Sequence, residues 1–206
     1  MQTKLYGCVF FILSISLSFA QKTLHQNFKK LSCPEKWWVI SHPFIAKKTY
    51  VLTQKAIDVS KEIKKDTALD GDENGGQVDA FRHAYWMALL TQNIKPHKAL
   101  RLGIAHEKGN KLNFNKSITE EETLPDSVSC VMDMENNKTG IELGKTNISM
   151  NQEELKQFIK KQILLGQMKI ISKDNSGNFL DCSGNKIIME TFKGKWNIPK
   201  CLKPSN

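Results

Sequence analysis

Apolar residues that recur at steps of three and four are the feature that most limits the fold of this chain. In the clearest case a single stripe follows Pro43, a residue favoured in the first turn of a helix: Ile45, Thr49, Leu52, Ala56, Val59 and Ile63. Similar spacing, together with proline, glycine and capping signals, predicts helices over residues 43–63, 78–92, 96–109, 125–144 and 151–166. The sequence therefore predicts a mainly α-helical domain of about five helices.

The character of the sequence changes after Gly166. Two short apolar runs, Met168–Ser172 and Lys186–Met189, are separated by the turn-forming segments 174–177 and 183–185. We expect them to pair as a small β-hairpin. The predicted organisation is a signal peptide over residues 1–20, a helical domain over 21–166 and a disulfide-pinned, β-rich tail over 167–206.

The first twenty residues have the pattern of a secretory signal peptide. Lys4 precedes the apolar run Leu5–Phe19, and small residues end at Ala20, where a leader peptidase would cleave before Gln21. The run is too short for a comfortable membrane span, and no later segment approaches one. We expect an exported protein, periplasmic or secreted, with no transmembrane segment after cleavage.

Four cysteines remain after that cleavage, and an even number in an exported chain favours disulfides. Cys182 and Cys201 flank one glycine-containing segment, which makes theirs the shortest loop to close. Their pairing leaves Cys33 with Cys130. We therefore expect two bridges.

The charge of the chain is strongly basic but is carried almost entirely by lysine. The formal net charge is +9, and only Arg82 and Arg101 among the 30 basic residues are arginine. Because arginine makes most bidentate contacts to bases, specific nucleic-acid readout is not expected. A lysine-coated surface is loosely attracted to anionic envelopes, so the expected partner is a macromolecular or envelope substrate of unknown identity.

Chemistry-bearing side chains gather on two consecutive predicted helices. Asp79 and His83 stand four residues apart on one helical face, with Trp86 following, and His106 and Glu107 lie on the next helix. The link between these helices is only three residues long, so they should be antiparallel neighbours. We expect both histidines to be mostly buried, with rings within about 8 Å of each other, a span that one divalent metal or one bridging water can cover.

The acidic loop before the helix predicted over residues 78–92 admits two interpretations. Asp70, Asp72 and Asn74 alternate and precede Gly75, as in a calcium-binding loop, but the twelfth position is Phe81 instead of glutamate. A turn that caps the following helix is the interpretation we favour.

Three blocks resemble an uncharacterised bacterial domain family of exported proteins and toxin-like C-terminal modules. They are Asp79–Trp86, Ala105–Glu107 and Met132–Gly140. The resemblance implies that Asp133 and Asn137 share one site with the histidines, and it implies no reaction. Ile141 departs from the pattern of the toxin-like members, which often carry arginine there.

Two functions are compatible with these residues. In an exported hydrolase, His83 or His106 acts as base or metal ligand, and Asp79 or Glu107 is its carboxylate partner. Four further residues would position the substrate: Arg82, Trp86, Asp133 and Asn137. In a non-catalytic envelope or binding protein, the same side chains form a buried hydrogen-bond network that fixes helix packing.

Overall fold

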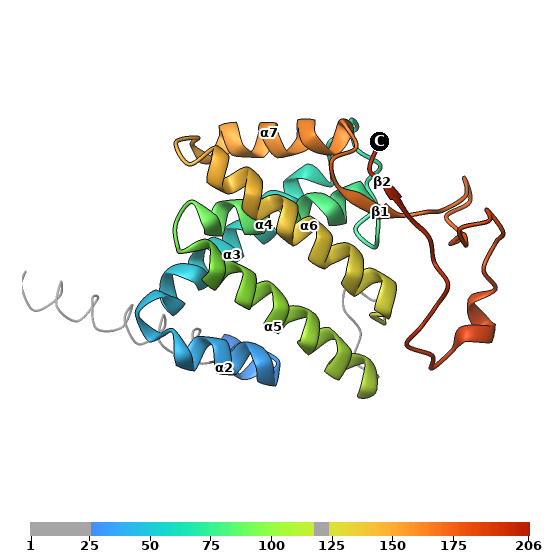
Figure 1. The fold of residues 1–206 in the computed structure, drawn as a ribbon, viewed down its shortest axis with the longest axis horizontal. Coiled ribbons are helices and arrows are strands. Elements are labelled where there is room, and N and C mark those ends of the chain that lie inside the picture. Colours follow the sequence, from blue (N-terminus) through green and yellow to red (C-terminus); the bar gives the residue numbers. More distant parts are fainter. Residues whose placement is uncertain (1–25, 118–123) are drawn as a thin grey trace, which may run out of the picture.

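The computed structural model describes residues 26–117 and 124–206, so the predicted signal peptide lies outside the described residues. Residues 26–30 are helical. The elements that follow are α2 (Cys33–Ser41), α3 (Pro43–Ile63), α4 (Gln77–Thr91), α5 (Pro96–Asn115), α6 (Ser127–Thr146), α7 (Gln152–Leu164), β1 (Lys169–Ile171), the 3-10 helix η1 (Met189–Phe192) and β2 (Leu202–Pro204) (Figure 1). Within these described ranges no helix is long and apolar enough to cross a membrane.

The mainly helical class is confirmed, but the helices outnumber the five predicted. The additional helix α2 begins at a capping box, in which Ser32 and Glu35 each accept a hydrogen bond from the other's backbone N–H. Helix α5 also continues past Gly109, where the sequence suggested its end. Gly109 is a packing position instead, because a Cβ there would collide with the side chain of Ser32.

Helix α4 is the centre of the domain. Its side chains are buried around nearly the whole circumference, and it contacts α3, α5, α6, α7 and β1. A helix that is apolar on all sides has to be surrounded by other elements. The polar residues Asp79 and His83 therefore lie in the interior of the molecule.

Helix α6 approaches α4 closely because glycines occupy the contact. A Cβ at Gly140 would lie 2.8 Å from the Cα of Ala84, and one at Gly144 would lie 2.6 Å from the carbonyl oxygen of Ala88. Residue numbers increase in the same direction along both helices from the first pair to the second, so α4 and α6 run parallel. The same stripe of α6, one and two turns earlier, carries Asn137 and Asp133 towards α4.

The C-terminal tail is β-rich but differs from the predicted hairpin. Strand β1 pairs antiparallel with β2, with Ile170 opposite Lys203, and not with residues 186–189. The predicted second strand contributes only an isolated bridge between Leu180 and Lys186 and the start of η1. The closing strand was missed because the segment 202–204 is three residues long, ends in proline and has no apolar alternation.

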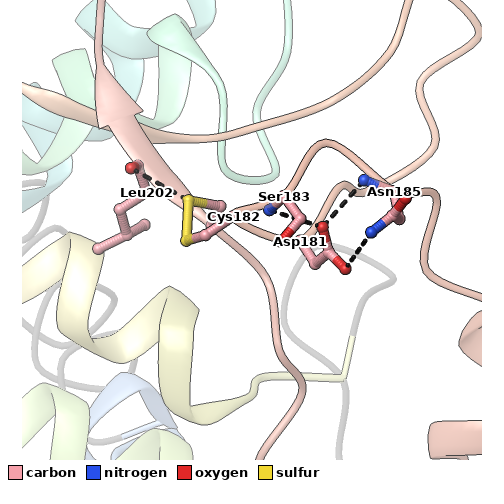
Figure 2. Close-up of a disulfide and its surroundings, with 6 residues drawn as sticks. Asp181, Cys182, Ser183, Asn185 and Leu202 are labelled. Carbon is pink, nitrogen blue, oxygen red and sulfur yellow. Dashed lines mark hydrogen bonds between the residues drawn. A yellow bond between two sulfur atoms is a disulfide. The ribbon is translucent and has the colours of Figure 1, made fainter.

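One of the two expected disulfides is confirmed. Cys182 and Cys201 are bonded, and beside the bond Asp181 accepts hydrogen bonds from Ser183 and Asn185 (Figure 2). The expected bridge between Cys33 and Cys130 is wrong, because both are free thiols. Cys33 is exposed at the start of α2, whereas the thiol of Cys130 is hydrogen-bonded to Glu107.

Candidate functional site

His83 lies among polar side chains of its own helix α4 and of the facing helix α6. Its Nδ1 lies 3.3 Å from Oδ1 of Asn137, and its Nε2 lies 3.5 Å from Asp79 and 3.4 Å from Asp133. Only 3% of the imidazole side chain is exposed. A carboxylate from each of two helices thus faces the same nitrogen, so the nearby negative charge is buried and concentrated.

The loop before α4 and a residue one turn further along the helix hold Asp79 in place. Its Oδ2 accepts a 2.7 Å hydrogen bond from the backbone N–H of Gly75, and Nη2 of Arg82 donates to Oδ1 at 2.6 Å. Gly75 adopts a φ of +87°, and a side chain there would also strike Ile171 of β1. The acidic loop acts as a turn: Asp70 accepts from the N–H groups of Asp72 and Gln77.

Asp79, His83 and Asp133 form a group with the composition of a metal site. Each offers one ligand atom, all within 4.8 Å of one another and all buried. One imidazole nitrogen and two carboxylate oxygens suit borderline cations such as Zn²⁺ or Mn²⁺. Among the residues described, His106 and Glu107, both expected as ligands, are not in this group, and Asp133 is.

A small cavity of about 40 Å³ borders the group and is lined by Asp79, Arg82 and Asp133. One buried water needs roughly 10–15 Å³, so the space itself holds an ion or a few waters, and a larger substrate would contact it from outside. The tail supplies the opposite wall through Phe179 and Lys200.

A buried ion pair holds this wall in place. Lys200 Nζ lies 2.5 Å from Asp126 and 3.7 Å from the centre of the Phe179 ring, and both ionic side chains are 3% exposed. A cation buried this deeply needs such partners. The tail therefore anchors against the start of α6, beside the candidate site.

His106 lies next to the group but has a different partner. Its ring centre is 6.1 Å from that of His83, which confirms the expected approach, and the Trp86 ring stands roughly perpendicular to both imidazoles. Its side chain is 23% exposed, so it is less buried than expected. Nδ1 lies 3.1 Å from Oε1 of Glu35 on α2.

Glu35 is a functional candidate that the sequence analysis missed. Burial raises the pKa of its carboxyl group, but hydrogen bonding and charge attraction from His106, with hydrogen bonds from Ser32, outweigh burial and leave the pKa below its ordinary value. Glu35 is therefore ionised at neutral pH and orients the ring of His106. The capping box at Ser32 was the signal that could have revealed α2 and this residue.

The remaining predicted residues occupy separate positions around the group. Glu107 is buried, accepts a hydrogen bond from Asn110 of its own helix at 3.3 Å and lies beside Cys130 of α6. Burial, followed by the negative charges of Glu107 and Asp133, raises the pKa of the Cys130 thiol far above its ordinary value. The indole N–H of Trp86 donates to Thr53.

A sequence model described as a domain of unknown function, DUF6973, matches residues 36–167, which is more than half of the chain. The chain belongs to this family. No curated protein and no solved structure matches it.

The DUF6973 match contains the whole group of Asp79, His83 and Asp133, together with His106. Glu35 and the tail residues that wall the cavity lie outside the matched range. The interior group is thus built from DUF6973 helices alone, whereas the partner of His106 and the cover of the cavity come from flanking segments.

Proposed function

We propose that the protein is an exported, metal-dependent hydrolase in which Asp79, His83 and Asp133 hold a divalent cation. The observation that carries the proposal is the convergence of three buried ligand atoms within 4.8 Å beside a water-sized cavity. Three protein ligands with an adjacent open position are typical of catalytic metal sites, whereas structural zinc sites have four.

The neighbouring side chains suit hydrolysis. A divalent cation at this position would lower the pKa of a bound water and so supply hydroxide at neutral pH. His106, oriented by ionised Glu35, can accept or return a proton at the edge of the site. Arg82 offers positive charge to an anionic substrate or transition state.

Asn137 has a further role in this proposal. Its Oδ1 faces His83 and holds the imidazole in position, as outer partners of metal-bound histidines do. Within the described ranges its Nδ2 is buried without a hydrogen-bond partner, so it can donate to a buried water.

Export, and an envelope macromolecule as substrate, are also part of the proposal. The Cys182–Cys201 disulfide supports an oxidising compartment, because such bonds persist mainly in exported proteins. The signal-peptide pattern at residues 1–20 supports the same location.

A second candidate function is a non-catalytic protein whose polar group only fixes helix packing. The 2.6 Å contact from Arg82 to Asp79 favours it, because the guanidinium already supplies positive charge to the buried carboxylates. In that case the cavity holds water alone.

Metal binding separates the two candidates. The purified protein is stripped with a chelator and titrated with Zn²⁺ and Mn²⁺ by calorimetry, and turnover of p-nitrophenyl acetate and bis(p-nitrophenyl) phosphate is measured with and without the metal. We expect one bound cation and metal-dependent turnover of one reporter ester.

Matched variants locate the site. His83→Ala should abolish cation binding and turnover, whereas His106→Ala should retain the cation and lose turnover. A folded wild-type protein that binds neither cation would contradict the hydrolase and favour the packing network. Cation binding without turnover of either ester would leave a metal site and reject this hydrolase chemistry.

A further inference from the structure

A second, larger hollow lies on the other side of Trp86. It is a groove of about 530 Å³, within the usual range for small-molecule sites. Helices α2 and α3, together with residues 27–31, form its walls, and α4 and α5 each contribute one large side chain. The large apolar and aromatic lining residues are Phe28, Leu31, Trp38, Tyr50, Trp86 and Leu102.

The polar atoms of these aromatic walls are already engaged by the protein. Trp38 donates its indole N–H to the backbone oxygen of Lys98, and Trp86 donates to Thr53. The hydroxyl of Tyr50 accepts from Asn27 at 2.6 Å. The rings therefore present hydrocarbon faces to the groove, and an apolar ligand would displace no hydrogen bond from them.

One buried polar atom in the lining has no partner. Thr49 is 3% exposed, and its Oγ1 makes no hydrogen bond within residues 26–117 and 124–206. A buried unpaired hydroxyl is costly, so a ligand with an acceptor oxygen next to its apolar part would relieve that cost.

The charge around the groove is positive on balance, with two lysines against the one carboxylate of Glu35 among the described lining residues. Lys30 and Lys47 both line it and are exposed to solvent. Residues 21–65 contain ten lysines against three acidic residues. An anionic head group outside an apolar chain matches this arrangement, whereas a cationic one would be repelled.

We propose that the groove binds a single-chain anionic amphiphile of the fatty-acid class, with the chain against the aromatic walls and the carboxylate near Thr49 and the two lysines. This site is distinct from the metal group and does not depend on the proposed hydrolase. Glu35 is the acidic residue among the described lining, and its charge is already paired with His106.

The test is calorimetric titration of the purified protein with dodecanoate below its micelle concentration, with dodecanol and dodecylammonium as neutral and cationic probes of equal length. We expect saturable binding of one dodecanoate. We also expect dodecylammonium to bind about tenfold more weakly, because the rim is positive.

Variants connect the binding to the groove. Ala46→Trp fills the groove and should weaken dodecanoate binding at least about tenfold, since the chain then has no space. Val51→Trp, an exposed position on the same helix outside the lining, is the matched control and should bind as wild type. Thr49→Val removes the hydroxyl at nearly constant shape and should weaken dodecanoate more than dodecanol.

Three results would overturn the proposal. The first is absence of saturable binding, as expected if a segment of this chain occupies the groove. The second is equal affinity in wild type and Ala46→Trp, provided that circular dichroism shows both folded. The third is a concentration-dependent dimer that Ala46→Trp dissociates, because the groove would then be covered by a second copy.

Discussion

The two histidines of the candidate site lie in contrasting surroundings although their rings are 6.1 Å apart. His83 is 3% exposed and faces carboxylates from α4 and α6, inside the helical core. His106 is 23% exposed and faces the single carboxylate of Glu35, at the side of the apolar groove. The surroundings of His83, here called the interior side, have the negative charge that a cation needs. The surroundings of His106, here called the groove side, have the solvent access that proton exchange needs.

The two sides also depend on different parts of the fold. The interior side requires the close approach of α6 to α4 at Gly140. The groove side requires α2, which the capping residues Ser32 and Glu35 begin. One side can therefore be damaged while the other is kept, and this separation can be tested.

The largest effect should come from adding a side chain at the glycine contact between α4 and α6. A methyl group at Gly140 would meet the backbone of Ala84, which cannot move as a flexible side chain can. Gly140→Ala should lower the free energy of unfolding by about 3 kcal/mol, measured by urea denaturation. It should also abolish cation binding, because Asp133 and His83 are displaced from each other.

The adjacent, half-buried position provides the control. Thr139→Ala changes a neighbouring side chain on α6 that does not face α4, and its unfolding free energy should change by less than about 0.5 kcal/mol. Equal stability of the Gly140→Ala protein and this control would show that the helices can separate without cost, contrary to the structure.

The next effect concerns the positive charge of the interior side. Arg82→Met removes the partner of Asp79, so the metal-free protein should lose about 2 kcal/mol of stability. A divalent cation should restore most of this loss, since it neutralises the same carboxylates. Thermal denaturation with and without Zn²⁺ measures both quantities. Loss of stability that no cation restores would favour the packing network.

A smaller effect should appear on the groove side. Glu35→Gln keeps the shape but removes the charge that faces His106, and it should cost about 1 kcal/mol at pH 7. Cation binding should be unchanged, whereas turnover should fall.

The pH dependence of this cost follows from the direction of the Glu35 shift. Because folding lowers the pKa of Glu35, its ionised form adds stability at pH values above the ordinary pKa of 4.5, and this stability is lost as the pH falls through the lowered pKa. The difference in unfolding free energy between wild type and Glu35→Gln should thus shrink in acid. A difference that grows as the pH falls would contradict an ionised Glu35.

The sequence predicted the helices whose apolar stripe or capping residues are continuous, and it placed the two histidines together. Spacing could not identify the third member of the group, because Asp133 reaches His83 only through a glycine contact between helices remote in sequence. The sequence also predicted that Glu107 would lie with the histidines. Glu107 follows His106 directly on α5 but faces Cys130 of α6 instead. One residue of displacement turns a side chain by about 100° and changes its partners.

The tail illustrates a different limit. Apolar runs suggested that residues 168–172 and 186–189 pair, but the partner of β1 is the last short segment of the chain. The pairing of this segment depends on interactions with residues distant in sequence, which a local pattern cannot predict. They are the disulfide, the Lys200–Asp126 ion pair, and the hydrogen bond that buried Ser205 donates to the backbone oxygen of Ile163.

The two free cysteines within residues 26–117 and 124–206 provide the mildest test of the contrast between the two sides, because labelling them reports on each side without altering stability. Cys33 is exposed at the start of α2, on the groove side, whereas Cys130 lies on α6 with a pKa raised by burial and by Glu107 and Asp133. Since only the thiolate reacts, a disulfide reagent at pH 8 should label one cysteine rapidly and a second at least about tenfold more slowly. Cys33→Ser should remove the fast phase alone. Two equally fast phases would mean that the interior side is as open as the groove side, and no labelling before reduction would restore the Cys33–Cys130 bridge that the sequence suggested.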